Sequence, residues 1–453
     1  MKKLIALLLA VVMVMGLAAC GSKTTTETKA PTEAKVDTPA TEAKTDAPAA
    51  AGSVYYLNFK PEFDQALQGL AASYTEKTGV PVKVVTAASG DYSNTLNAQM
   101  GKDGAPTVYN IGNMSGLKDW DEYALDLTGT ALAGELATND FNLYNEAGEL
   151  KAMGYCYESF GIIVNTKLLA DAGHSLDEIK DFASLKAVAD DIHARAAELG
   201  FDAFSSAGLD GSSSWRFSGH LANMPLYYEF RDDGVKEQPA EIKGTYLDNF
   251  RNIWDLYITD SAADPTALST ATGDQSEAEF GEGKAVFYQN GTWEYAALTA
   301  DKFNLNPDEI AMIPIYCGVD GEEKAGLCSG TENCWAINSQ AKEEDIQASL
   351  DFLYWLVTDP DASAVLVEQL GAVPFKSCPA SANKFIVDGN DLLAKGNYAV
   401  TWAFNYTPNV DSWRATVVTA LAAYSADPTD ANWEAVKTAF VDGWAIEYKT
   451  VNG

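Results

Sequence analysis

A short apolar run near the middle of the chain predicts a buried central strand. Residues Ala285–Tyr288 are consecutively apolar or aromatic, with glycines before them and the Asn290-Gly291 pair after them. Runs of this kind between turn residues are typical of strands that are buried on both faces. Trp293 follows the turn, close to Gln289 and Asn290. An aromatic face with amides beside it suits a sugar ring, and the alternative is a Trp that only fills the core.

The chain from residue 53 to residue 111 alternates between strand and helix patterns. Strands are predicted at 53–59, 80–85 and 106–111, with a helix after the first strand that Gly79 ends and a short helix at 93–100. This alternation favours parallel βαβ units, whose ligands bind at the carboxyl ends of the strands. The polar residues at those ends are Asn58, Lys60, Glu62 and Asn113.

The second half of the chain combines further strands and helices with two aromatic segments. Strands are predicted at 155–164, 310–315 and around 334–338, and amphipathic helices at 182–199 and 247–257. The first aromatic segment, predicted as a loop at 211–229, carries Trp215 and His220, and the second, at 402–408, begins with Trp402. Loops of this composition either bind a ligand or cover the core.

The N-terminus has the pattern of a lipoprotein export signal. Lys2 and Lys3 precede an apolar run of sixteen residues, and the run ends in Leu-Ala-Ala-Cys at 17–20. We therefore expect residues 1–19 to be a signal peptide and Cys20 to be lipidated, which would attach the protein to the outer face of a bacterial membrane. An uncleaved anchor is the alternative, although a membrane-spanning helix needs about 20 apolar residues. Residues 20–52 are rich in Thr, Ala, Pro, Glu and Lys and predict a disordered tether.

Composition bounds the class of protein and of ligand. The chain has 453 residues, of which 47% are hydrophobic, so it can form large cores in two or three domains. Its formal net charge of −33 makes nucleic acid an improbable partner and biases the ligand away from anions. Nothing in the pattern indicates an obligate oligomer, and we expect a monomer.

The cysteines and histidines indicate neither a metal site nor a catalytic centre. No Cys-x-x-Cys pair occurs, and the three histidines are far apart, so no metal and no cofactor is expected. Residues 326–330 resemble a nucleophile elbow with Cys328 in place of Ser, but such short matches are common and no His is nearby. If the segment around 319–324 is a hairpin turn, Cys317 and Cys328 approach the separation that a disulfide requires.

Several motifs together resemble one family. These are the lipobox at 17–20, Gly161–Leu169, Phe280–Val286 continuing through Asn290–Trp293, and Gly371–Pro374. They resemble the extracellular solute-binding proteins of ATP-binding-cassette (ABC) importers, in particular the carbohydrate-binding group related to maltose and raffinose receptors. The resemblance extends over essentially the whole chain. The segment from Trp215 to Asn223 is similar to the subgroup that binds oligosaccharides with α-galactosyl ends.

The resemblance implies two α/β lobes, a hinge between them and a central ligand cleft. It places 53–160 and 294–335 in the N-terminal lobe, and 161–293 and 336–453 in the C-terminal lobe. Hinge crossings are expected near Ser159–Ile163, Gln289–Glu294 and Cys334–Asn338. The implied function is to bind an extracellular sugar and to deliver it, by hinge closure, to the permease subunits in the membrane.

Candidate ligand-binding residues follow from the chemistry of sugars. A sugar needs aromatic faces for its C–H surfaces and polar side chains for its hydroxyls. The candidates for stacking are Trp215, Trp293 and Trp402, and those for hydroxyl recognition are Lys60, Asn113, His220, Asn290, Glu332 and Asn333. Two other classes stay open: a peptide-binding or adhesin-type surface lipoprotein, and an extracellular glycosidase, for which no carboxylate pair stands out.

Overall fold

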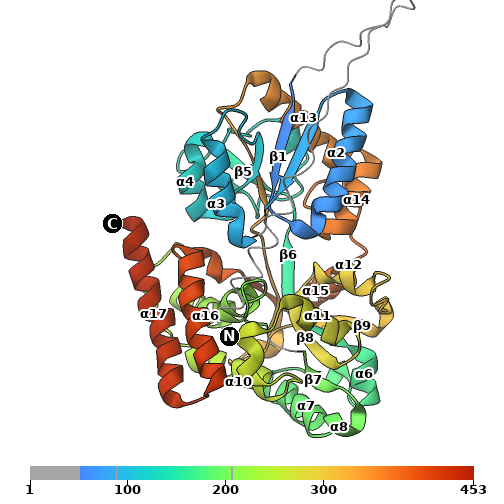
Figure 1. Cartoon of the computed structure of the whole chain (residues 1–453), viewed down its shortest axis with the longest axis vertical. Helices are drawn as coiled ribbons and strands as arrows, with labels where there is room; N and C mark the ends of the chain where they lie inside the picture. The colour runs from blue at the N-terminus through green and yellow to red at the C-terminus, as the bar shows by residue number, and fades with distance from the viewer. Residues whose placement is uncertain (1–51, 88, 206–207) are drawn as a thin grey trace, which may run out of the picture. The chain divides into compact units, whose positions relative to one another are not determined.

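The computed structural model describes residues 52–87, 89–205 and 208–453 (Figure 1). The predicted signal peptide, Cys20 and residues 20–51 of the predicted tether lie outside these ranges. Among the described helices, none combines the length and the apolar character needed to cross a membrane.

The first sheet confirms the predicted parallel units near the start of the folded chain. Strand β1 pairs in parallel with β2 and with β3, and Tyr56 lies opposite Val84 and Val108. The later strand β11 pairs antiparallel with β3 and β5. In spatial order the strands are β2 (Val82–Thr86), β1 (Val54–Asn58), β3 (Val108–Asn110), β11 (Cys334–Ile337), β5 (Leu150–Gly154) and β4 (Leu143–Tyr144).

The first lobe is built on this sheet. The apolar side of α2 shows why its sequence forms a helix here: Leu67, Leu70, Ala71 and Tyr74 are buried at helical spacing, and Gly79 ends the helix with a left-handed φ of 77°. Helices α2, α13 and α14 pack their apolar residues in one core with β1 and β11 (Figure 1). The helical segments of this lobe are η1 (Pro61–Phe63), α2 (Asp64–Thr78), α3 (Ser89–Met100), α4 (Met114–Trp120), η2 (Asp121–Tyr123), α5 (Ala131–Gly134), α13 (Glu343–Thr358) and α14 (Pro360–Leu370).

The second sheet is organised around β6, whose eight residues are all buried. The predicted central strand is β8, and it pairs antiparallel with β6, so that Gly161 lies opposite Asn290. The strands are β12 (Tyr398–Thr401), β10 (Ala325–Gly330), β6 (Glu158–Asn165), β8 (Ala285–Gly291) and β7 (Asp202–Phe204), with β9 (Ile310–Ile313) also pairing with β6.

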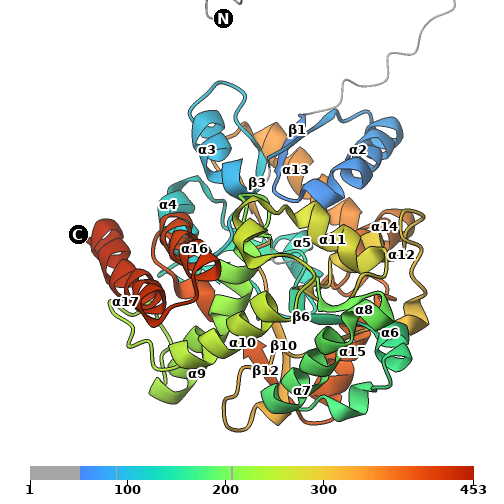
Figure 2. The same ribbon diagram turned by 60° about the horizontal axis from the view of Figure 1, so that its bottom comes forward.

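Helices surround the second sheet and complete the second lobe. Figure 2 shows α16 and α17 side by side. The buried Trp413 of α16 packs edge to face against the buried Trp444 of α17. The helical segments are α6 (Thr166–Asp171), η3 (Leu176–Glu178), α7 (Phe182–Ala194), α8 (Ala196–Leu199), η4 (Arg216–Leu221), α9 (Ala222–Asp233), α10 (Leu247–Thr259), η5 (Pro265–Thr270), α11 (Gly273–Gly281), α12 (Glu294–Thr299), η6 (Pro307–Glu309), η7 (Glu322–Lys324), α15 (Lys384–Ala394), η8 (Ala403–Tyr406), α16 (Val410–Ala426) and α17 (Asp430–Asn452).

The chain crosses between the lobes at three places within the described residues: 155–157, 331–333 and 371–383. Two predicted crossings, Ser159–Ile163 and Cys334–Asn338, lie just after the first two of these. The predicted crossing at Gln289–Glu294 is wrong, because β8 and α12 both belong to the second lobe.

The predicted lobe boundaries need the same correction. Strands β9 and β10, within 294–335, pair with β6 in the second sheet, whereas β11, α13 and α14 belong to the first lobe. The first lobe is therefore 53–154 with 334–370, and the second is 158–330 with 384–453. The reason is that β11 inserts between β3 and β5 by long-range pairing, which no local pattern encodes.

Two further predictions of local structure are also wrong. Most of the predicted loop at 211–229 is helical, since η4 is a π-helix that continues directly into α9 despite Gly219 and Pro225. Cys317 and Cys328 are free thiols rather than a disulfide. They do not face each other across a hairpin, because β9 and β10 each pair with β6 and not with each other.

Candidate functional site

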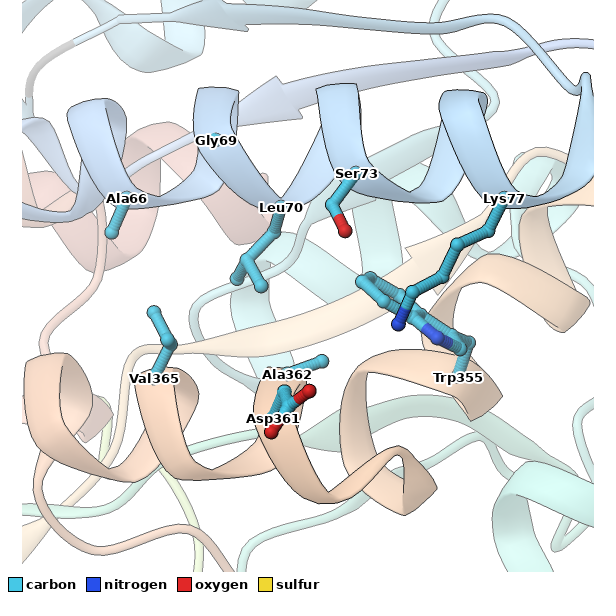
Figure 3. A pocket seen from close by; sticks show the side chains of 9 residues that line it. All are labelled: Ala66, Gly69, Leu70, Ser73, Lys77, Trp355, Asp361, Ala362 and Val365. Carbon is cyan, nitrogen blue, oxygen red and sulfur yellow. The ribbon is translucent and has the colours of Figure 1, made fainter.

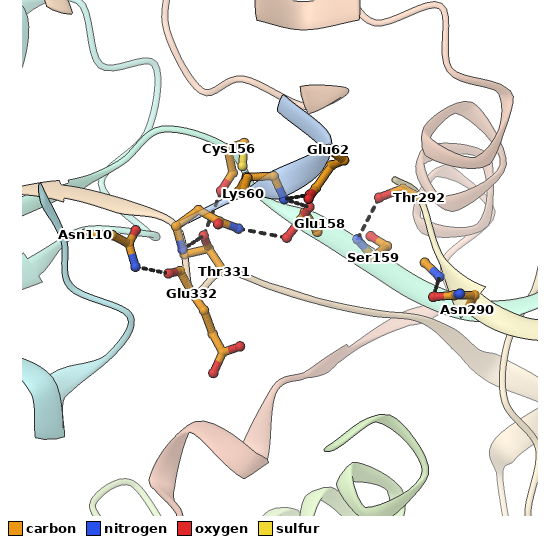
Figure 4. Close-up of polar contacts among 12 residues, drawn as sticks. Lys60, Glu62, Asn110, Cys156, Glu158, Ser159, Asn290, Thr292, Thr331 and Glu332 are labelled. Atoms are coloured by element: carbon orange, nitrogen blue, oxygen red, sulfur yellow. Dashed lines mark hydrogen bonds and ion pairs between the residues drawn. The ribbon is translucent and has the colours of Figure 1, made fainter. Parts of the chain in front are cut away.

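A buried ion-pair network lies where two of the crossings meet (Figure 4). The Lys60 Nζ lies 2.6 Å from Glu158 Oε1 and 2.8 Å from Glu62 Oε1. The Asn333 amide donates to the other Glu158 oxygen at 2.7 Å. Burial lowers the pKa of Lys60, but the Glu158 and Glu62 carboxylates outweigh this and raise it well above its ordinary value. Lys60 is thus charged, and its ammonium group is used within this network. The network connects the end of β1 to the crossings at 155–157 and 331–333.

The sequence around Lys60 explains how its side chain is positioned. Asn58 ends β1, and its amide donates to the Lys60 carbonyl at 2.7 Å while its oxygen accepts from the Lys60 N–H at 3.2 Å. This local pairing turns the chain, and Pro61 then begins η1. The turn directs the Lys60 side chain to the interlobe crossings.

Glu332 lies on the second crossing, but its side chain leaves the Lys60 network. The Glu332 carbonyl accepts from the Asn110 amide at 2.9 Å. The neighbouring Thr331 hydroxyl accepts from the Asn333 N–H at 2.8 Å and donates to the Cys156 carbonyl at 2.7 Å. The backbone is therefore held firmly, while the carboxylate extends away (Figure 4). Burial raises the pKa of Glu332, and nearby Arg414 partly offsets this.

Three predicted residues from two distant parts of the sequence form an aromatic cluster in the second lobe. The Trp215 ring lies 5.0 Å from His220 and 5.8 Å from Trp293, and His220 lies 5.5 Å from Trp293. We call Trp215, His220, Trp293 and the neighbouring Phe160 the aromatic cluster. Both Trp side chains are half-buried, so each keeps accessible ring surface. Such rings can stack on the C–H faces of a sugar.

His220 is the polar centre of this cluster. Its ring stacks on Phe160 at 3.9 Å with 10° between the planes, and its Nδ1 lies 2.9 Å from the Gln289 amide nitrogen. Burial, followed by the positive charges of Arg216 and Arg414, holds the pKa of His220 well below its ordinary value. The imidazole is therefore neutral, and with Gln289 donating to Nδ1 the proton is on Nε2. A neutral imidazole of this kind can donate one hydrogen bond to a hydroxyl.

The π-helix η4 sets the spacing of Trp215 and His220. Its Arg216 is buried and donates to the Gln289 carbonyl at 3.2 Å and to the Ser276 hydroxyl at 3.1 Å. These bonds tie η4 to β8 and α11. Single π turns are often found at functional sites, because the wider turn redirects side chains.

Trp293 reaches the cluster by folding back over β8. A β-carbon on Gly291 would lie only 2.2 Å from the Trp293 ring, so any larger residue here would displace that ring. The neighbouring Asn290 is 2% exposed; its amide donates to the Tyr288 hydroxyl at 2.7 Å, and its oxygen accepts from the Gly291 N–H at 2.9 Å. Both ends of that side chain are thus used within β8.

The remaining two predicted residues are also held by local contacts. Trp402 is 7% exposed, donates to the Cys328 carbonyl at 3.0 Å, and packs against both Phe160 and Phe404. Asn113 caps α4 and accepts from the Gly116 N–H at 2.9 Å. Of the predicted residues, the structure therefore brings Trp215, His220 and Trp293 together. It connects Lys60 to Asn333 through Glu158. Asn113 and Asn290 instead bond within their own segments.

Several residues beside these groups were not singled out from the sequence. Phe160 lies inside a strand and reads only as a core residue, and Arg414 carries no motif. Gln289 was noted from the sequence only as an amide close to Trp293. Glu294, at the start of α12, is half-buried. Burial and Glu277 raise the pKa of Glu294 to about 7. Its position directly after Trp293 was the available signal.

A separate groove lies on the first lobe, between α2 and α14 (Figure 3). It has a volume of about 350 Å³ and contains none of the predicted site residues. Its lining is mostly apolar or small: Ala66, Gly69, Leu70, Ser73, Lys77, Trp355, Asp361, Ala362 and Val365.

Comparison with known structures identifies the same two-lobed fold in sugar-binding proteins. The solute-binding protein RafE in complex with raffinose has a TM-score of 0.69 and 16% identity, and the match covers 88% of this chain and 99% of that chain. The GacH receptor of Streptomyces glaucescens, with a TM-score of 0.65 and 19% identity, matches over 88% and 99%. A sugar transporter protein of Bacillus licheniformis in complex with stachyose, with a TM-score of 0.66 and 15% identity, matches over 87% and 100%.

At these identities the structural matches establish the fold. A comparison with curated protein sequences found no match. The family model described as bacterial extracellular solute-binding protein matches residues 69–389, which is well over half of the chain. The chain therefore belongs to the bacterial extracellular solute-binding proteins.

Proposed function

We propose that this protein binds an extracellular oligosaccharide between its two lobes and delivers it to an ABC importer by hinge closure. The observation that carries the proposal is the aromatic cluster, in which two half-buried Trp rings flank a neutral His. Aromatic faces and a neutral donor suit a sugar, whereas an ionised ligand would need a charged partner. The structural relatives with bound raffinose and stachyose support this ligand class.

Within this proposal the predicted residues have different roles. Trp215 and Trp293 stack on the sugar, and His220 donates to one of its hydroxyls. Lys60 and Asn333 hold the crossings, because their polar groups bond within the Lys60 network. Oligosaccharides with an α-galactosyl end are the first ligands to test.

A thermal-shift screen against mono-, di- and trisaccharides and a set of short peptides tests the proposed function. A ligand present at about 100 times its Kd stabilises the native state by about 2.7 kcal/mol, which gives a measurable rise in melting temperature. We expect stabilisation by at least one oligosaccharide and by none of the peptides. Stabilisation by peptides alone would instead favour the peptide-binding class, and release of product from a saccharide would favour the glycosidase.

We also propose that Cys20 carries the lipid that holds the protein at the outer face of the membrane, next to the permease subunits. The sequence at 17–20 supports this. Wild type grown with a labelled fatty acid should carry the label, and the Cys20→Ser protein should not, because it lacks the acceptor thiol. Labelling of the Cys20→Ser protein, or an unlabelled wild type, would contradict lipid anchoring at this residue.

A further inference from the structure

A group of polar side chains beside the aromatic cluster is only partly satisfied within the protein. It comprises Glu332 on the second crossing, Asn405 of η8 and Arg414 of α16, and we call it the polar corner. The Asn405 amide donates to the carbonyl of Thr331, the residue before Glu332, at 3.2 Å. This bond holds η8 of the second lobe against the crossing that carries Glu332. Glu332 and Asn405 are therefore neighbours, and the charge of Arg414 acts on Glu332 from a third segment.

Arg414 connects this corner to the aromatic cluster. Its guanidinium lies 5.0 Å from the ring centre of Phe404, the residue before Asn405. Its Nη2 lies 3.1 Å from the point where a β-carbon on Gly219 would stand, so it packs against the turn that carries His220. Arg414 thus lies between the polar corner and the aromatic cluster.

Each member of the corner has hydrogen-bonding capacity that the described residues leave unused. The Asn405 Oδ1 and the Arg414 Nε are buried and have no partner among those residues. Over the same part of the chain, no hydrogen bond or ion pair is formed by the Glu332 carboxylate, which points away from the Lys60 network (Figure 4). A buried polar atom without a partner costs about 1–3 kcal/mol, and more if it is charged. Two such atoms, beside a half-buried carboxylate that has no partner among the described residues, indicate a ligand that completes them.

The chemistry of the corner indicates which ligand group fits. A guanidinium only donates, a carboxylate and an amide oxygen accept, and a hydroxyl can do both, so neighbouring hydroxyls of a sugar match the set. An anionic ligand is disfavoured here, because the positive charge of Arg414 is opposed by Glu332 and by nearby Asp411 on α16.

We propose that Glu332, Asn405 and Arg414 form a second sugar subsite, which binds the hydroxyls of a sugar unit next to the one stacked on the aromatic cluster. This inference rests on the proposed function and adds a selectivity for oligosaccharides over monosaccharides. In this arrangement Glu332 accepts from the second unit on the first-lobe side, while Arg414 donates to it on the second-lobe side. The second unit therefore bridges the lobes.

Calorimetry on wild type, Arg414→Gln and Glu332→Gln tests the subsite. The probes are raffinose, stachyose, maltotriose and chitotriose, with galactose, glucose and N-acetylglucosamine measured by competition. Each variant should lose about tenfold or more in affinity for the best trisaccharide or tetrasaccharide, and stay within about twofold for its monosaccharide. Arg231→Gln is the matched control, since Arg231 pairs with Asp232 at the surface, and it should bind as wild type does.

The outcomes separate this inference from the proposed function. Oligosaccharide binding that is unchanged in both variants overturns the subsite while leaving the sugar receptor intact. Equal losses for oligosaccharides and monosaccharides show that the pair acts on closure rather than on a second unit, and also overturn it. Wild type that binds no saccharide in the panel refutes the proposed function and this inference together. If Arg414→Gln does not fold, Glu332→Gln alone decides, because the Glu332 side chain makes no bond that its replacement would break.

Discussion

Replacement of Glu294 by Gln should stabilise the protein, and the gain should appear only as the pH rises. Glu294 is half-buried at the start of α12, directly after Trp293. Burial raises its pKa, the Glu277 and Glu62 carboxylates add to this, and Arg216 and the Tyr288 hydroxyl oppose it, with a result of about 7. A neutral Gln has the shape of the protonated side chain but never carries the charge that this environment disfavours.

The magnitude follows from the two pKa values. A rise from 4.5 to about 7, at about 1.36 kcal/mol per pH unit, corresponds to about 3 kcal/mol at most, and partial access of water reduces this to about 1–2 kcal/mol. Because the pKa is raised in the folded state, the protonated carboxyl favours folding below pH 4.5, and this contribution is lost as the pH rises through about 7. The variant should therefore equal wild type at about pH 4.5 and exceed it above about pH 7.

Urea unfolding followed by Trp fluorescence, at several pH values between about 4.5 and 8, measures this difference. Glu76→Gln is a suitable control, because Glu76 is an exposed carboxylate on α2. A free-energy difference that is the same at every pH, or a Glu294→Gln protein that is less stable than wild type at pH 8, would refute the reasoning.

Three further predictions concern the crossings and the cores. Lys60→Met should lower the free energy of unfolding by about 3–5 kcal/mol, measured by urea titration, because it leaves the Glu158 carboxylate buried without its cation; a loss below about 1 kcal/mol would contradict the network's role. Gly330→Ala should lower the free energy of unfolding by about 1–3 kcal/mol in the same assay, because the new β-carbon would lie 2.5 Å from the Trp402 ring. An unchanged free energy of unfolding would show that the ring moves freely. Saturating sugar should reduce the radius of gyration in small-angle scattering, and an unchanged radius would argue against hinge closure.

Local patterns were sufficient for the parts of the fold that depend on local structure. The parallel pairing of β1 with β2 and β3 agrees with the alternation of strand and helix, and the apolar run at 285–288 forms the first four residues of β8. Both signals come from consecutive side chains and nearby turn residues, from which strands and helices can be predicted directly.

Long-range pairing and local exceptions account for the errors. β11 enters the first sheet beside β3, so that Ala336 lies opposite Tyr109, and this removes 336–370 from the predicted second lobe. Residues 211–229 were predicted as a loop, whereas the burial of Phe217 and Leu226 on the core side stabilises the helices η4 and α9 there. Tertiary packing outweighed local propensity in η4 and α9.

In the candidate site, too, local sequence patterns predicted some residues, and long-range packing placed the others. Trp215, His220 and Trp293 were chosen for their chemistry and do lie together, because aromatic residues at strand ends and in irregular segments stood out. Arg414 carries no sequence signal, since an Arg within a helix is normally a surface residue. Its placement beside Phe404 depends on the packing of α16 against η8 and η4.

The central claim is that the aromatic cluster binds the sugar. It is tested most directly by calorimetric titration of Trp215→Ala and Trp293→Ala with the oligosaccharide that wild type binds best. Stacking beneath a sugar ring should contribute about 1 kcal/mol or more, so each variant should lose about tenfold or more in affinity, while its melting temperature changes little because both side chains are half-buried. Wild-type affinity in both variants, together with lowered melting temperatures, would show that these residues only support the core and that the sugar binds elsewhere.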